Sequence, residues 1–297
     1  MSRDSEKPIV FSHLFNSVYD PDSGDVRDST VTQQHIQEAI MLLQQEEGIS
    51  LQVGNPANFL KDFLRSHSRN AWWPQEIAQA GFTARQSYGE SRVFDFVPYT
   101  EGQTVPFPDE FLLPGTAPIH PIEAVSLPSA ARALGRGDEA WLIQVCVNQR
   151  ILQTHFALFS DIDVVDLFHL QNSLKGRPEI DAVFLLVFNA GGEQKKALMT
   201  LEAKRKDPIL PYQIKGQVAL MAKQSRKRVD LSDIEFIVPI ATSVIRRGGE
   251  TIIAIFEMAP ISVADGVAAY DQRTSHDLPL VIAKSVGYAL SPKVSGI

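Results

Sequence analysis

The sequence contains a single cysteine, Cys146, among its 297 residues. One thiol cannot form an intrachain disulfide, and it excludes the zinc sites that need several cysteines, so we expect the chain to work in a reducing compartment. Long apolar runs are missing too, because no segment approaches the ~20 apolar residues of a membrane span. The charged residues 1–8 do not have the pattern of a signal peptide. We therefore expect a cytoplasmic protein that does not enter a membrane.

The chain also lacks an excess of basic residues, since Asp and Glu number 35 against 28 Lys and Arg, which gives a formal net charge of −7. This balance argues against a polyanionic partner for the surface as a whole. The distribution is uneven, however, because residues 195–228 hold 10 basic and 2 acidic residues, a net charge of +8. The sequence thus predicts a local nucleic-acid-binding surface, and a solvated basic helix face is the alternative.

Prolines are concentrated in one segment, because residues 98–128 contain 7 of the 18 prolines in the chain. Proline at this density opposes helices and interior strands, so this segment is predicted to be a connector. We expect residues 1–128, with the connector at their end, to form a mostly helical N-terminal region. Residues 129–297 are expected to form a second domain of the α/β class.

Two helices are predicted in the N-terminal region. Apolar residues at helical spacing indicate one helix over residues 30–48, with Thr30 and Gln33 as a capping box. A second helix is expected to begin at Asn55-Pro56, where a capping residue precedes a proline at the first helical position. Both helices carry an apolar stripe and are predicted to pack against a core.

The next segment has the order of a helix-turn-helix. A short helix is expected to end near Gln79, Gly81 supplies a turn, and a polar second element follows. Arg85, Gln86 and Arg92 in that region are candidate DNA contacts, since such side chains bind bases and phosphates. The alternative is a surface segment anchored by aromatic residues.

The C-terminal domain alternates helical and strand patterns. A long helix is expected over residues 138–159 and another over residues 212–227. Strands are predicted at residues 182–188, 197–204, 234–240 and 251–256. This order predicts a small sheet with helices on its faces.

The candidate catalytic residues lie on a predicted hairpin. Asp181 opens an apolar strand, Gly191-Gly192 marks the turn, and the partner strand ends with Glu202 and Lys204. A hairpin symmetric about the turn places Asp181 opposite Glu202, and the two-residue period of a strand places Lys204 on the same face. Two buried acids resist joint ionisation, and a divalent cation with hard oxygen ligands, such as Mg²⁺, would relieve the conflict.

An acid within residues 178–181, a hairpin, and then Glu202-Ala203-Lys204 at the end of an apolar strand resembles the motif of the PD-(D/E)XK nuclease superfamily. The resemblance covers residues 138–240. It implies a restriction-endonuclease-like core, with a central mixed sheet flanked by helices. It also implies that Asp181 and Glu202 hold Mg²⁺ and that Lys204 orients or polarises the attacking water.

The family pattern leaves one position open. Its first acid often follows proline directly, which would nominate Glu179, whereas the hairpin register favours Asp181. On the following helix, Gln213 and Gln217 are accessory candidates that could bind a metal-bound water or a phosphate. The acidic residues 161–166 are interpreted as a capped loop, with a further metal ligand as the alternative.

The resemblance implies a magnesium-dependent endonuclease acting on double-stranded DNA, with a sequence-specific type II restriction endonuclease as the leading expectation. Arg205, Lys206 and Lys215 are candidate contacts to backbone phosphates. Enzymes of this kind commonly act as homodimers, whose two-fold symmetry matches palindromic sites. Two alternatives remain: a structure-specific repair or recombination nuclease, and a non-catalytic DNA-binding module with a degenerate nuclease core.

Overall fold

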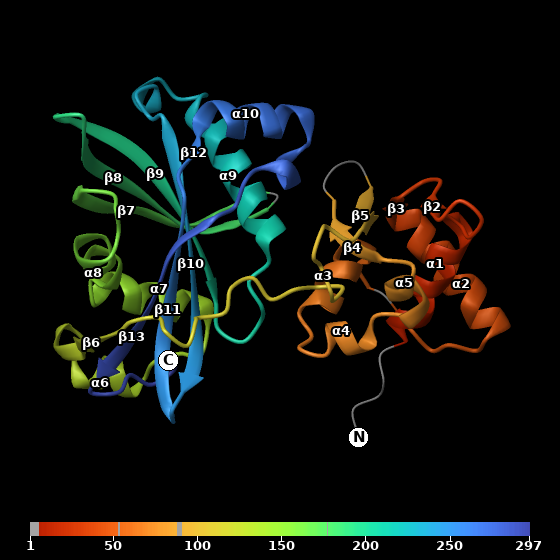
Figure 1. Cartoon of the computed structure of the whole chain (residues 1–297). Helices are drawn as coiled ribbons and strands as arrows, with labels where there is room; N and C mark the ends of the chain where they lie inside the picture. The colour runs from red at the N-terminus through yellow and green to blue at the C-terminus, as the bar shows by residue number, and fades with distance from the viewer. Residues whose placement is uncertain (1–5, 53, 88–90, 177) are drawn as a thin grey trace. The chain divides into compact units, whose positions relative to one another are not determined.

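The structure is a computed structural model that describes residues 6–52, 54–87, 91–176 and 178–297. The chain forms two compact units, Met1–Asp109 and Glu110–Ile297 (Figure 1). The division lies inside the predicted connector, and residues 110–128 belong to the second unit. The reason is β6 (Ile119–Glu123), which forms one edge of the large sheet although it contains Pro121. An edge strand tolerates proline because one of its sides need not donate hydrogen bonds.

The first unit combines short helices with small antiparallel sheets, so the expectation of a mostly helical region was incomplete. Its elements are α1 (Lys7–Val18), β1 (Tyr19–Asp20), β2 (Asp25–Val26), β3 (Thr30–Thr32), α2 (Gln33–Glu46), the 3₁₀ turn η1 (Pro56–Asn58), α3 (Phe59–Leu64), α4 (Arg69–Trp72), α5 (Gln75–Gln79), β4 (Phe82–Gln86) and β5 (Arg92–Pro98). β1 pairs with β2, and a three-stranded sheet has the order β3-β5-β4. Aromatic rings, Phe11 at the centre, fill the core.

Two predictions for this unit were wrong in detail. The capping box of α2 is formed by Thr32 and His35, because Thr30 lies in β3, paired with Asp95. The predicted helix-turn-helix is absent from the described part of this segment, because the polar element after Gly81 is the strand β4, which pairs with β5. Antiparallel pairing with β5 therefore stabilises a strand where the sequence pattern indicated a helix.

The second unit contains the large sheet. Its elements after β6 are η2 (Ala124–Ser126), α6 (Ser129–Ala133), α7 (Glu139–Asn148), α8 (Ile151–Leu158), β7 (Val164–Leu174), β8 (Ile180–Ala190), β9 (Glu193–Lys204), α9 (Pro211–Ser225), η3 (Val229–Leu231), β10 (Phe236–Arg247), β11 (Glu250–Met258), β12 (Ile261–Ser262), α10 (Val263–Gln272), η4 (Ser275–Asp277) and β13 (Ile282–Ser291). The strand order is β6-β13-β11-β10-β9-β8-β7, with β12 paired to β10. The unit is therefore an α/β fold with a mixed sheet, because β9–β10 and β6–β13 are parallel and the other pairs are antiparallel.

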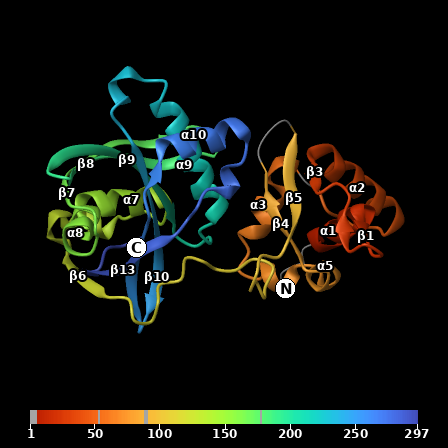
Figure 2. The same cartoon turned by 45° about the horizontal axis from the view of Figure 1, so that its top comes forward.

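Helices cover both faces of this sheet (Figure 2). α7 and α8 pack on one face through residues such as Leu142, Cys146 and Leu152. α9 and α10 pack on the other face. They approach closely at Gly266, where an added Cβ would lie 2.6 Å from Cβ of Ala222.

The predicted helix over residues 138–159 is two helices, so that expectation was wrong. Arg150, between α7 and α8, has a φ of 52°, and a left-handed residue interrupts the helical hydrogen-bond pattern. In the described parts of the chain, no helix has both the length and the apolar character needed to span a membrane.

Candidate active site

The β8–β9 hairpin brings the predicted acids together. Its register pairs Ala182 with Leu201 and Ala190 with Glu193, so the predicted symmetric hairpin is confirmed. Asp181 and Glu202 extend this register by one position in each strand. Their side chains face α9, since Val183 and Leu198, which have the same alternation, pack in the core beneath that helix.

Lys204 lies at the centre of the acidic group. Its Nζ is 2.6 Å from Glu202 Oε1, 3.2 Å from Glu139 Oε1 and 4.0 Å from Asp181 Oδ2. The same nitrogen donates to the backbone oxygen of Ala203 at 3.1 Å. Burial lowers the pKa of Lys204, but the three carboxylates together outweigh it and the pKa is raised. Lys204 therefore remains an ammonium ion and supplies the positive charge among the acids.

Glu202 is fully buried on β9. The side-chain amide of Gln217 on α9 donates to its Oε2 and, at 2.8 Å, to the backbone oxygen of Glu179. Glu202 Oε1 forms an ion pair with the Lys204 ammonium at 2.6 Å. Burial, and then the charge of Asp181, raises the pKa of Glu202 to about 8, although Lys204 and Gln217 act in the opposite direction. An ionised Glu202 is therefore disfavoured unless a further positive charge arrives.

Asp181 occupies the solvent-facing side of the group. Its side chain is 20% exposed, and its Oδ2 accepts a hydrogen bond from the backbone N–H of Ala203 at 2.9 Å. This bond fixes the carboxylate against the end of β9. A ligand approaching from solvent would thus meet Asp181 before the buried Glu202.

Glu139 is a member of the group that the sequence reasoning missed. It begins α7, where the N-cap Asp138 accepts a hydrogen bond from the N–H of Trp141 at 2.8 Å. Burial, together with Asp181, raises the pKa of Glu139 despite the nearby Lys204. The sequence signal was an acid in a capped first helical turn, but nothing in its spacing links that turn to β9.

The accessory candidates Gln217, Gln213 and Glu179 differ in how they contact the acidic group. Gln217 contacts Glu202 as described, and Gln213 lies one turn earlier on α9 and is also buried. Glu179 is exposed, and its carboxylate accepts a hydrogen bond from the hydroxyl of Ser173 on β7. Glu179 therefore reaches the site through its backbone oxygen, and the geometry favours Asp181 as the first acid.

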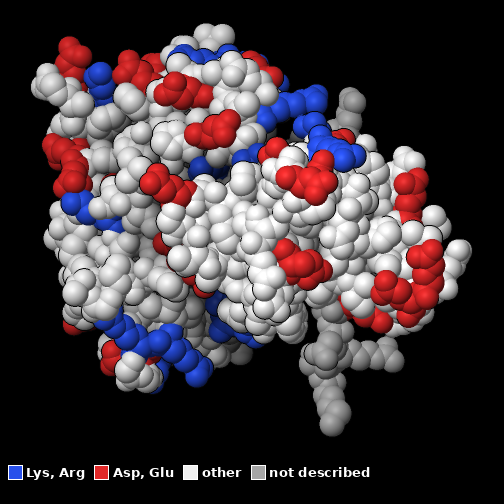
Figure 3. Space-filling view, turned by 45° about the vertical axis from the view of Figure 1, so that its right-hand side comes forward, with Lys and Arg blue, Asp and Glu red and all other residues white. Residues whose placement is uncertain are grey.

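Several basic residues of the segment 195–228 form ion pairs with acidic residues. Ion pairs join Lys195 to Glu235, Lys196 to Asp233, Lys223 to Asp271 and Arg228 to Asp230. On the face drawn in Figure 3, small groups of Lys and Arg are interspersed with Asp and Glu. Folding thus neutralises much of the charge asymmetry seen in the sequence.

The other predicted DNA contacts have varied surroundings. Arg205 donates to the backbone oxygens of Gly296 at 2.6 Å and Gly137 at 3.4 Å, so it stabilises the loop before α7. Lys215 donates to the backbone oxygen of His276, and Lys206 is exposed. Arg85 and Gln86 lie on β4 and Arg92 at the start of β5, all in the first unit.

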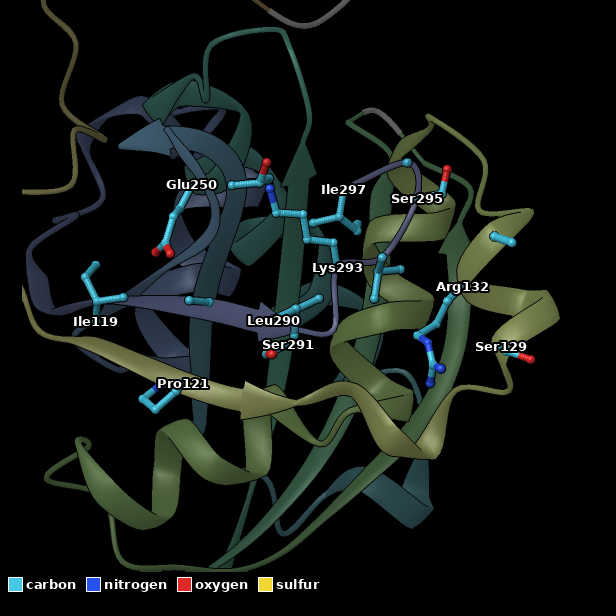
Figure 4. Close-up of a pocket in the computed structure, with 15 residues that line it drawn as sticks. Ile119, Pro121, Ser129, Arg132, Glu250, Leu290, Ser291, Lys293, Ser295 and Ile297 are labelled. Atoms are coloured by element: carbon cyan, nitrogen blue, oxygen red, sulfur yellow. The ribbon is translucent and has the colours of Figure 1, made fainter. Parts of the chain in front are cut away.

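A pocket of about 950 Å³ lies away from these acids, near β6, α6 and the end of β13 (Figure 4). Arg132 lines it, but its Nη1 donates to the backbone oxygens of Ala124 and Leu127 at 2.9 and 2.7 Å. The guanidinium of Arg132 thus stabilises the local backbone, and none of the residues of the acidic group lines the pocket.

No protein-family model, curated protein or solved structure matches this chain. In the described residues, no group of three or more His, Cys, Asp or Glu side chains has the arrangement of a metal site. The position of Lys204 explains this, because its ammonium group lies between the carboxylates that could otherwise converge on a cation. The three carboxylates Glu139, Asp181 and Glu202 thus share one positive charge, the ammonium group of Lys204.

Proposed function

We propose that this chain is a magnesium-dependent endodeoxyribonuclease that hydrolyses phosphodiester bonds in double-stranded DNA. The observation that carries the proposal is the buried Glu202, which lies beside Asp181 at the end of a hairpin and shares the Lys204 ammonium with it. A protein gains no stability from placing a second acid beside a buried one. Such an arrangement is typical of sites that bind a cation.

The chemistry of the side chains present is the kind that Mg²⁺ prefers, although in the described residues they do not have the arrangement of a metal site. Asp181 and Glu202 would hold it, with Glu139 as a third oxygen donor, since Mg²⁺ prefers carboxylate oxygens together with water and phosphate. One buried acceptor, Gln217 Oε1, has no hydrogen-bond partner within the described residues, and Glu202 Oε1 has the Lys204 ammonium as its partner. Acceptors of this kind can bind a cation or its water ligands.

The chemistry divides between the ion and the chain. When bound, Mg²⁺ would polarise the scissile phosphate and lower the pKa of a coordinated water. Lys204 would position the attacking water or stabilise charge that develops on the phosphate. Gln217 holds Glu202 in place through its hydrogen bond, and Asp181 presents an oxygen to solvent.

Within this class, we propose a sequence-specific restriction endonuclease that acts as a homodimer in the cytoplasm. The motif resemblance supports the class, and the separate first unit supports a role in recognition, with Arg85, Gln86 and Arg92 as candidate contacts. Lys206 and Lys215 remain candidate phosphate contacts, whereas Arg205 is assigned to the loop before α7.

Cleavage of plasmid and long linear DNA in the presence of Mg²⁺ tests the proposal. We expect discrete fragments with Mg²⁺ and intact DNA with EDTA. Nicking that depends on DNA structure would replace the restriction assignment with a repair nuclease. Absence of cleavage on every substrate would reject the enzymatic proposal and leave a DNA-binding module.

A matched pair of variants identifies the site. Glu202→Gln removes one charge from the acidic group, whereas Glu257→Gln makes the same change in another buried glutamate of the same sheet. We expect the first to abolish cleavage and the second to retain it. Cleavage by Glu202→Gln at the normal rate would refute the assignment of the site.

A further inference from the structure

The two edges of the large sheet differ in how well they are protected from pairing with a further strand. β6 is a strand of five residues and contains Pro121, which cannot donate to another strand. β7, at the opposite edge, has eleven residues without proline, and in the described chain it pairs with β8 alone. A long strand with one free side offers backbone donors and acceptors to a further strand. The β7 edge is therefore the open edge of this sheet.

Large apolar side chains lie on that open edge. Val165, Phe168 and Leu170 are 51%, 47% and 49% exposed. Phe168 lies opposite Leu185 of β8, and Leu185 packs against the core beneath α9. The apolar face of the sheet therefore extends from β8 to the exposed strand β7. Several large apolar side chains exposed on one unpaired strand are a feature of sites of association.

The charges at the two ends of β7 are opposite. Asp163 and Asp166 lie at its beginning, and Lys175 follows its last residue. Asp163 also accepts a hydrogen bond from the side chain of Asn189 at 2.9 Å, which holds it at the strand end. An antiparallel partner that is a second copy of β7 would bring the acidic end of one strand against the basic end of the other.

One register satisfies both the charges and the apolar residues. If a two-fold axis passes through His169, Asp163 lies opposite Lys175 of the second copy, because both residues are six positions from the axis. By residue number, the same register brings Phe168 beside Leu170 of the second copy, and Leu170 is the extra residue of a register shift, with no partner in β8. The contact is self-complementary and would cover part of both half-exposed side chains, as an isologous interface requires.

We propose that β7 is the interface between two copies of this chain, paired antiparallel about a two-fold axis at His169 into one continuous sheet. Register shifts in β7 between Val164 and Asp166 and between His169 and Gln171 lie on either side of the axis and interrupt regular pairing there. The pairing uses the open edge of both copies, and the remaining β6 edges carry Pro121. The assembly therefore closes at two copies. This inference rests on the homodimer of the proposed function and names its interface, and its test does not depend on DNA cleavage.

Sedimentation equilibrium of the full chain over a range of concentrations tests the interface. We expect the unmodified chain to be a dimer and Phe168→Asp to raise the dimer dissociation constant about tenfold or more, since a central apolar anchor is replaced by a charge. The matched control is Leu134→Asp, at a residue that is 80% exposed and lies outside β7. It is expected to leave the dimer unchanged, and circular dichroism checks that each variant is folded.

A charge swap tests the register. Asp163→Lys or Lys175→Asp alone is expected to weaken the dimer, and the double variant is expected to restore it. A monomeric unmodified chain, or a dimer that Phe168→Asp leaves intact, would overturn the proposal. Failure of the double variant to recover would overturn the register. None of these outcomes bears on whether the chain cleaves DNA, so the two proposals are tested separately.

Discussion

Two glutamates are buried in the large sheet, and their surroundings differ. Glu257 on β11 accepts a hydrogen bond from the hydroxyl of Ser160 at 2.8 Å, and its other oxygen is 2.9 Å from Nε2 of His155. His155 continues the network to the hydroxyl of Tyr288 at 3.0 Å. Glu202 on β9 has one oxygen held by Gln217 and the other beside the Lys204 ammonium, with Asp181 next to it.

The difference distinguishes an acid with a structural role from the one that we propose to be catalytic. Both oxygens of Glu257 have hydrogen-bond partners, and this is how a folded protein accommodates a buried polar group. Glu202 has a like charge, Asp181, as its neighbour, and this proximity costs stability although Lys204 lies beside it. Local conflict of this kind is expected where function requires it. Replacing each glutamate should therefore have opposite effects on activity and stability.

The largest expected effect is the loss of cleavage in Glu202→Gln, by roughly a thousandfold. The amide keeps the size of the side chain but cannot supply the charge that a bound cation needs. Single-turnover cleavage of the preferred substrate at saturating Mg²⁺ measures it. Glu257→Gln is the control, and cleavage per folded molecule should stay near that of the unmodified chain.

The hairpin that creates this site could be predicted because its information is local. Two glycines, Gly191 and Gly192, adopt φ values of 63° and 84°, and this conformation favours a tight turn with a fixed register. The register then places Asp181 opposite Glu202 without any knowledge of the rest of the fold. Alternation along β9 adds Lys204 to the same face.

Long-range contacts could not be predicted in this way. Glu139 reaches Lys204 from another element, and no periodicity reports such a contact. β7 was missed because it is an edge strand whose exposed residues are both apolar and polar, so it lacks the alternation that identifies a half-buried strand. The charge excess of residues 195–228 was a real sequence feature, but acids from distant segments pair with it.

The second largest effect is expected in the other glutamate. Glu257→Ala leaves His155 and Ser160 without their partner inside the core, so we expect the free energy of unfolding to fall by about 3–5 kcal/mol. Urea denaturation followed by circular dichroism measures it. Glu235→Ala breaks an exposed ion pair with Lys195 and should cost less than about 1 kcal/mol. Equal losses in the two variants would contradict the structural role of Glu257.

Gln217→Met is expected to weaken Mg²⁺-dependent cleavage by about 10-fold to 100-fold, because methionine cannot donate to Glu202. The reduction should appear chiefly as a higher Mg²⁺ concentration for half-maximal rate. Gln213→Met is the matched control, since Gln213 is buried one turn earlier on the same helix. Similar losses in both variants would indicate that α9 packing, rather than the hydrogen bond, is responsible.

A pH dependence of Mg²⁺ affinity follows from the pKa of about 8 for Glu202 in the folded, metal-free chain, against an ordinary value of 4.5. Between those two values the folded chain holds a proton that the unfolded chain has released, so this group lowers stability as the pH rises through that window. Mg²⁺ must displace the same proton.

Affinity should therefore fall about tenfold for each unit of pH below 8 and level off above it. Calorimetry at pH 7 in two buffers of different ionisation enthalpy counts the displaced proton, and we expect about one per ion. Glu202→Gln serves as the control, and a proton release that persists in this variant would assign the effect to another group.

The smallest effect is expected at Glu179, the alternative first acid. Its carboxylate accepts a hydrogen bond from Ser173 on the exposed surface, and its link to the site is the backbone oxygen that Gln217 contacts. Substitution to alanine preserves that oxygen, so cleavage by Glu179→Ala should stay within about twofold of the unmodified chain. Asp181→Asn, measured in parallel, should lose activity to the extent of Glu202→Gln. The reverse result would make Glu179 the residue that completes the acidic pair, and the hairpin register would then not be what selects the first acid.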